Sequence, residues 1–232
     1  MKVLNQLAKQ KKFWIYIILF TTLVVISLQQ SLLEYLEVDL SAHMIVEHGL
    51  FFTMGILILL LSENLLKILV TTGNPLPKDS PAARGKLHVR SSVIGYWKHI
   101  ARALFRLNGF YWIFIAASLI IFWHIPTVFD TAERNNEIHI LQHISFMIVG
   151  TTLYLGLRSL GENSVIFLIF SMAGMMALNG LVFVLLTGRI YLPYSLLSHI
   201  EAGNYMIITS IIILLVVFPT YIIKRSMHSL NV

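Results

Sequence analysis

The chain of 232 residues contains no cysteine and little charge. Without cysteine it cannot form disulfides, iron–sulfur clusters or thiolate metal sites, whichever side of a membrane its loops face. Asp, Glu, Lys and Arg make up only 12% of the residues, whereas a soluble globular chain has about 25%. Hydrophobic residues reach 57%, and the mean hydropathy is +0.78. This composition excludes an ordinary soluble domain.

The charges are clustered, and the stretches between the clusters are apolar. A transmembrane helix needs roughly 20 apolar residues, and six stretches approach or exceed that length. Their approximate bounds are 13–33, 43–70, 109–125, 138–160, 165–187 and 203–223. We therefore expect an all-α, polytopic membrane bundle of six transmembrane helices, with residues 1–232 forming a single integral-membrane domain in the lipid bilayer. The first stretch follows three lysines and lacks a small-residue cleavage motif, which is typical of an uncleaved signal anchor.

The formal net charge of +6 is explained by topology rather than by nucleic-acid binding. When the loops are assigned alternately to two sides, one side receives all of the 17 Lys and Arg except Arg134 and Arg189. The other side receives all but three of the 11 Asp and Glu. Because basic residues stay on the cytoplasmic side, both termini are expected in the cytoplasm. The acidic side then faces outward from the cytoplasmic membrane.

The long cytoplasmic loop is expected at residues 71–108, between the second and third spans. In its second half, apolar residues recur at helical spacing while Lys and Arg occupy the rest of the helix surface. This pattern predicts an amphipathic interfacial helix lying on the anionic inner leaflet. Such a helix could dock a partner, but a connector that lies along the membrane is the simpler interpretation.

Histidine is abundant for so apolar a chain, with nine residues. Six of the nine fall near the outer ends of the predicted spans; they are His43, His48, His124, His139, His143 and His199. Ionisable groups at membrane depth are costly and normally face the bundle interior or a water-filled cavity. Neutral imidazole is also the commonest metal ligand, and it suits copper, zinc, iron and nickel. The grouping therefore predicts a metal or cofactor site that faces outside.

The spacing of these histidines indicates which of them can share an ion. His139 and His143 are four residues apart, so they lie on one helix face. His43 and His48 are five apart, about 140° around an α-helix. They would converge only if the helix begins after His43 or is distorted there. His48 is therefore the stronger ligand candidate of the two.

Three further residues are weaker ligand candidates. Met44 shares a helix face with His48, and Glu47 shares one with His43. His199 precedes the predicted sixth span, so it could lie in a loop. Any one interfacial histidine more often anchors a helix end or bonds a carbonyl than binds a metal. An i, i+4 pair together with histidines from two further helices favours the metal site.

A family resemblance is carried by the same residues. Trp123 to Asp130 contains Trp-His-x-Pro and an acidic residue, and the next predicted helix opens with His139-x-x-x-His143. This block resembles the cytochrome c oxidase assembly factor CtaG family of the caa3 type, which has a Trp-His-x-Pro helix end, a short acidic turn and a following His-x-x-x-His helix. His43 to His48 is similar to that family's His-Met-x-x-His helix start, with one residue more between its histidines. The family typically has seven spans, against the six expected for this chain.

The resemblance implies copper handling outside the membrane in support of a haem–copper oxidase or a similar membrane copper enzyme. Copper held by His43, His48, His124, His139 and His143 for insertion into such a partner is the leading hypothesis, and the protein would then not be an enzyme. Permanent membership of a copper-dependent membrane oxidase or monooxygenase is a second hypothesis for the same site.

A haem site and a zinc-dependent hydrolase are two further alternatives, and each would give these residues different roles. A haem-binding electron carrier would use His48 and His143 as axial ligands, but the inner halves of the spans hold no histidine for a second haem. A zinc-dependent hydrolase would need Glu47 or Asp130 as a general base, and the sequence has no His-Glu-x-x-His motif.

Overall fold

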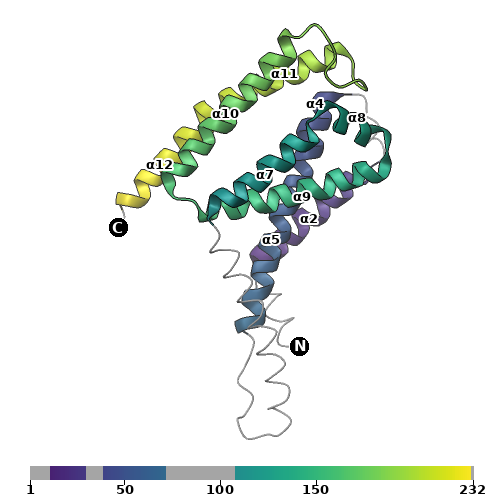
Figure 1. Cartoon of the computed structure of the whole chain (residues 1–232). Helices are drawn as coiled ribbons and strands as arrows, with labels where there is room; N and C mark the ends of the chain where they lie inside the picture. The colour runs from purple at the N-terminus through teal and green to yellow at the C-terminus, as the bar shows by residue number, and fades with distance from the viewer. Residues whose placement is uncertain (1–10, 30–38, 72–107, 231–232) are drawn as a thin grey trace, which may run out of the picture.

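The computed structural model describes residues 11–29, 39–71 and 108–230, and these residues form helices and connecting loops without any strand (Figure 1). The chain order is α2 (Lys11–Ser27), α4 (Leu40–Ala42), η1 (His43–Glu47), α5 (His48–Thr71), α7 (Gly109–Trp123), α8 (Pro126–Arg134), α9 (Asn136–Ser159), α10 (Glu162–Leu185), α11 (Leu196–Ile212), η2 (Ile213–Val217) and α12 (Phe218–Leu230). The η elements are single π-helical turns. The predicted all-α class is therefore confirmed.

Among the described residues, four helical stretches are long and apolar enough to cross a membrane. They are His48–Leu65, Asn136–Ser159, Glu162–Leu185 and the continuous stretch Leu196–Met227, and α7 with α8 makes a fifth if this bent pair counts as one span. The chain is thus a multi-pass membrane protein. The first predicted span, 13–33, overlaps α2, which has 17 residues and ends at Ser27. Residues 30–33 of that prediction lie outside the described ranges. The predicted interfacial helix of the long loop also lies outside them.

The helix predicted over 43–70 begins one turn earlier, at Leu40. Asp39 caps it, since its carboxylate accepts hydrogen bonds from the backbone N–H groups of Ser41 and Ala42 at 2.7 and 3.0 Å. The π-helical turn η1 then separates α4 from α5. A π turn holds one residue more than an α turn and is frequent at functional sites.

The segment after His124 corrects the short acidic turn that the family resemblance implied. The chain bends by 70° between α7 and α8, and Pro126 occupies the first turn of α8, where its missing N–H is not needed. The nine-residue α8 is amphipathic, and it buries Phe129 and Ala132. Asn135 then caps α9 through the N–H groups of Glu137 and Ile138.

Two glycines set the close packing of α5 on α9. A Cβ at Gly55 would overlap the carbonyl of Met147, and a Cβ at Gly150 would overlap the carbonyl of Phe52. Small residues allow such backbone contact between membrane helices. The hydroxyl of Thr151 also donates to the carbonyl of Gly55 at 3.0 Å. Close packing fixes the histidines at the start of α5 relative to those at the start of α9.

The remaining helices form a hairpin beside this bundle. α10 packs along α11, and α11 meets the rest of the chain at α4, near the end of the bundle where α8 lies (Figure 1). The helix predicted to begin at residue 203 in fact begins at Leu196, where Ser195 caps it. His199 therefore lies within a helix and not in a loop.

Candidate metal centre

Five of the predicted ligands meet at one end of the bundle and form an unbroken series of ring contacts. Ring centroids are 5.5 Å apart for His124 and His48, 5.2 Å for His48 and His43, 5.9 Å for His43 and His139, and 4.4 Å for His139 and His143. The rings come from the η1–α5 junction, the end of α7 and the first two turns of α9. We call these five residues the histidine cluster.

The spacing of the rings suits a shared ion. With a metal–nitrogen bond of about 2.0 Å and a nitrogen about 1.1 Å from its ring centre, two imidazoles on a tetrahedral ion have centres about 5 Å apart. The three contacts that involve His43 or His48 within the cluster lie between 5.2 and 5.9 Å. The rings are therefore near enough to share an ion if their nitrogens point toward it.

The side chains as they stand are not arranged as a finished site. In the described part of the chain, no group of three or more His, Asp and Glu side chains is placed to hold a metal ion. Three-ligand binding would require imidazoles to turn about their terminal torsions, which are soft. The structure thus shows gathered candidate ligands, whose rings would have to reorient to hold an ion.

The hydrogen bond of His124 fixes which of its ring nitrogens could bind a metal. Its Nδ1 lies 2.7 Å from the carbonyl of Ile120. Because a carbonyl only accepts, Nδ1 carries the proton, and in the neutral ring Nε2 keeps its lone pair. Metal-binding histidines commonly donate their second nitrogen in this way.

Phenylalanines surround the cluster. Phe146 packs on His48 at 3.9 Å between centroids, Phe51 stacks on His143 at 4.0 Å, and Phe129 touches His43 at 5.2 Å. His43 and His48 are 1% and 5% exposed, whereas the other three members are partly exposed. The cluster therefore has a buried centre, and its two ends, on α7 and on α9, are partly exposed to solvent or lipid.

Glu133 and Tyr194 also belong to this site, although neither is among the ligands predicted from the sequence. Glu133 Oε1 lies 3.5 Å from His43 Nε2, and the Tyr194 hydroxyl donates to Glu133 Oε2 at 3.2 Å. Tyr194 is 1% exposed and its ring centre lies 6.0 Å from that of His43. The sequence did contain one sign of Glu133: Pro126 marks a helix start, and Phe129 and Glu133 then share one helix face.

His199, in the first turn of α11, has a structural role because it holds the loop that precedes this helix. Its Nδ1 donates to the carbonyl of Ser195 at 2.7 Å, and its Nε2 accepts from the backbone N–H of Tyr191 at 3.0 Å. Both ring nitrogens are engaged, so we leave His199 out of the proposed ligand set. The hydroxyl of Tyr191 donates to the carbonyl of His124 at 3.1 Å. Burial, and then the nearby charge of Asp130, raises the pKa of Tyr191, so this donor stays protonated.

The two remaining weaker candidates have different outcomes. Met44 is 8% exposed and packs in a core with Leu40, Phe129 and Tyr194. The backbone of Glu47 lies in η1, but its side chain is outside what the structure describes. Ligation by either residue stays a prediction.

Gln142 is a further polar residue beside the cluster that the sequence analysis passed over. It lies on α9 between His139 and His143, is 0% exposed, and neither its Oε1 nor its Nε2 has a hydrogen-bond partner in the described part of the chain. Buried amides are nearly always satisfied by protein or water. Gln142 therefore offers a carbonyl oxygen to an ion or a water molecule at this end of α9.

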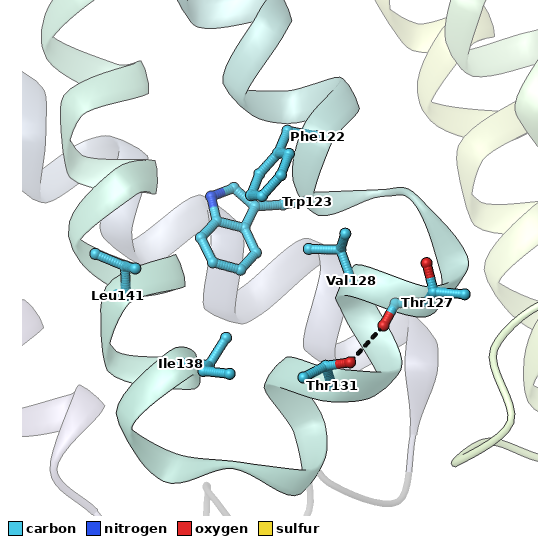
Figure 2. Close-up of a pocket in the computed structure, with 7 residues that line it drawn as sticks. All are labelled: Phe122, Trp123, Thr127, Val128, Thr131, Ile138 and Leu141. Carbon is cyan, nitrogen blue, oxygen red and sulfur yellow. Dashed lines mark hydrogen bonds between the residues drawn. The ribbon is translucent and has the colours of Figure 1, made fainter.

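Two hollows lie near the cluster. The larger, about 450 Å³, lies between α7, α8 and α9 (Figure 2). Its walls are Phe122, Trp123, Thr127, Val128, Thr131, Ile138 and Leu141. The Thr131 hydroxyl donates to the Thr127 carbonyl across one turn of α8. This hollow is apolar and is lined by no imidazole or carboxylate, so it is not a metal site.

Comparison with known proteins gives a family and no activity. Residues 18–225 match the family described as "Protein of unknown function (DUF1404)". No curated protein and no solved structure matches the chain. The link to oxidase assembly therefore stays a prediction. Because the match covers most of the chain, the protein belongs to the DUF1404 family.

Proposed function

We propose that this protein is a copper-binding membrane protein that supplies copper to a membrane copper enzyme and is not itself an enzyme. The observation that supports it most directly is the series of four ring contacts that joins His124, His48, His43, His139 and His143. An i, i+4 pair together with imidazoles from two further elements favours a shared ion over separate anchoring roles.

The ligand chemistry favours copper among the metals that imidazole suits. The affinity of a nitrogen site for divalent metals is highest for copper. Copper(I) also accepts few ligands, so two or three of these imidazoles would be enough to hold it. An ion held by movable imidazoles can be passed on, as delivery to a partner requires.

The proposal places the cluster on the outer side of the cytoplasmic membrane in a six-span chain with both termini inside. The cluster lies at the end of the bundle marked by α4 and α8 (Figure 1). At the far ends of α5 and α9, Arg158 donates to Glu63. Basic residues at that end support its cytoplasmic location.

The proposed recipient is a haem–copper oxidase or another membrane copper enzyme, as the resemblance of residues 123–146 implies. Permanent membership of such an enzyme is the second role that the same site could serve. Co-purification with the enzyme at fixed stoichiometry would favour the permanent subunit.

Haem binding and zinc hydrolysis receive less support from the geometry. Both candidate haem ligands are packed against phenylalanines, His48 on Phe146 and His143 on Phe51. That packing suits a small ion better than a macrocycle. For hydrolysis, the candidate general base Asp130 accepts a hydrogen bond from the backbone N–H of Leu192 at 3.2 Å. This bond gives Asp130 a structural role in holding the loop before α11.

Elemental analysis of the detergent-purified protein tests the proposal. Cells are grown with and without added copper, and the metal content per chain is compared. We expect copper in the parent, and its loss when His139 and His143 are both replaced by Ala. The matched control replaces His88 and His99, two histidines of the predicted cytoplasmic loop, and should keep its copper. A parent without copper, or a His139/His143 variant that binds as well as the parent, contradicts the proposal.

A further inference from the structure

The geometry points to Glu133 as a sixth metal ligand, which with His43 forms a capture site for divalent cations at the edge of the histidine cluster. This inference rests on the proposed function, because it adds the route by which an ion reaches the cluster. It gives a defined role to a buried carboxylate that topology alone would place at an exposed helix end.

The distance between the two donor atoms fits a shared ion. His43 Nε2 and Glu133 Oε1 are 3.5 Å apart. Two ligand atoms that are each about 2.1 Å from a tetrahedral ion lie about 3.4 Å from one another. In the structure as it stands, this is therefore a two-ligand arrangement that needs little reorientation.

The Glu133 carboxylate is held in place through Oε2, the oxygen farther from His43 Nε2 in this pair. Tyr194 donates to Oε2, and the Glu133 side chain is 6% exposed. Oε1 is buried and has no hydrogen-bond partner in the described residues, and it points at His43. A buried carboxylate oxygen in that position is costly without a compensating charge, and a bound cation would supply one.

A polar hollow adjoins Glu133. It has a volume of about 290 Å³ and is lined by Glu133, Arg134, Leu192 and Pro193. It thus lies between α8 and the loop before α11, and the bond from Leu192 to Asp130 fixes that loop. Glu133 therefore borders this hollow and also lies within 3.5 Å of His43, which is 1% exposed.

The donor set selects the kind of ion. A carboxylate with an imidazole suits divalent copper or zinc, whereas copper(I) favours softer ligands. We therefore assign the capture site to divalent cations and use Cu²⁺ as the probe. The four other imidazoles of the cluster would then join His43 in holding the ion after it leaves Glu133.

Stopped-flow mixing of the detergent-purified full chain with Cu²⁺ tests this assignment. Quenching of tryptophan fluorescence reports the rate of capture, and copper content after an hour reports capacity. Glu133→Gln keeps the shape and the Tyr194 contact but removes the charge. We expect capture at least tenfold slower with unchanged final copper content. Glu137→Gln, an exposed acid on the first turn of α9, is the matched control and should leave the rate unchanged.

The remaining outcomes each have a definite meaning. If Glu133→Gln captures Cu²⁺ as fast as the parent, or Glu137→Gln is slowed equally, the inference is wrong and the proposed function stands. If folded Glu133→Gln loses its copper content, Glu133 belongs to the storage site and the capture role is wrong. A parent that takes up no copper overturns both. Should Glu133→Gln not fold, Glu133→Asp withdraws the carboxylate by one methylene and should slow capture at least threefold; an unchanged rate contradicts the inference.

Discussion

His43 and His48 lie five residues apart, and their ring centroids are 5.2 Å apart because the turn between them is π-helical. In an α-helix, residues five apart point about 140° away from each other. In a π turn the backbone bonds run from i to i+5, so residues five apart lie one above the other. The extra residue that separates this motif from the His-Met-x-x-His pattern is thus absorbed without moving either ring off the shared face.

The π turn therefore predicts that deleting one residue from it affects copper affinity much less than inserting one does. Deleting Val46 leaves the histidines four apart, which an ordinary α turn also aligns, so copper affinity should change less than threefold. Inserting Ala after Val46 leaves them six apart and should lower affinity at least tenfold. Competition with a chelator of known copper affinity measures both. Equal losses in the two variants would show that the helix start, and not the alignment of the rings, controls binding.

A second prediction concerns the close contact that fixes α5 on α9. Gly55→Ala places a Cβ against the carbonyl of Met147, and the helices must separate to admit it. We expect a loss of about 2 kcal/mol in the free energy of unfolding, measured in mixed micelles by denaturant titration. Gly174→Ala is the control, because nothing lies within 4 Å of a Cβ at that position. It should be neutral or slightly stabilising, since Ala is the better helix former.

The gathering of the histidines could be predicted from the sequence because it depends on two simple regularities. Apolar runs fix where each helix crosses the membrane, and the spacing of His139 and His143 fixes their common face. Both depend on local sequence and on the bilayer, and neither needs knowledge of packing. The membership of His124 followed in the same way from its place at the end of an apolar run.

The rest of the site depends on contacts between residues distant in sequence. Glu133 and Tyr194 are 61 positions apart, and no periodicity relates them. The short helix α8 was missed because its amphipathic pattern spans only nine residues, and its acidic residues were fully explained by topology. The extent of the sixth helix was missed for a related reason: a cap at Ser195 begins it, whereas hydropathy rises only several residues later.

A third prediction isolates the bond that holds Glu133. Tyr194→Phe keeps the buried ring and removes only the hydroxyl that donates to Oε2. We expect a loss of about 1 kcal/mol in the free energy of unfolding. The reason is that Glu133 Oε2 loses the hydrogen bond from the Tyr194 hydroxyl. Tyr205→Phe, at a side chain that is 52% exposed, should have no effect. Thermal unfolding of the two variants in one detergent provides the comparison.

The last prediction concerns charge at the polar hollow. Arg134 lines it next to Glu133, so a cation approaching the carboxylate meets a like charge. Arg134→Gln should therefore speed the capture of Cu²⁺, and more so at low ionic strength, because the screening length falls from about 30 Å at 0.01 M salt to about 8 Å at 0.15 M. Stopped-flow rates at the two salt concentrations measure this difference.

Arg225→Gln is the control for the Arg134 experiment, because Arg225 pairs with Glu162 at 2.8 Å, at the start of α10. It removes the same charge from the chain at a place remote from the hollow, so the capture rate should not change. If both substitutions speed capture equally, net charge controls the rate and the hollow is not the route. If Arg134→Gln speeds capture alone, and the gain shrinks with salt, the ion passes Arg134 on its way to Glu133.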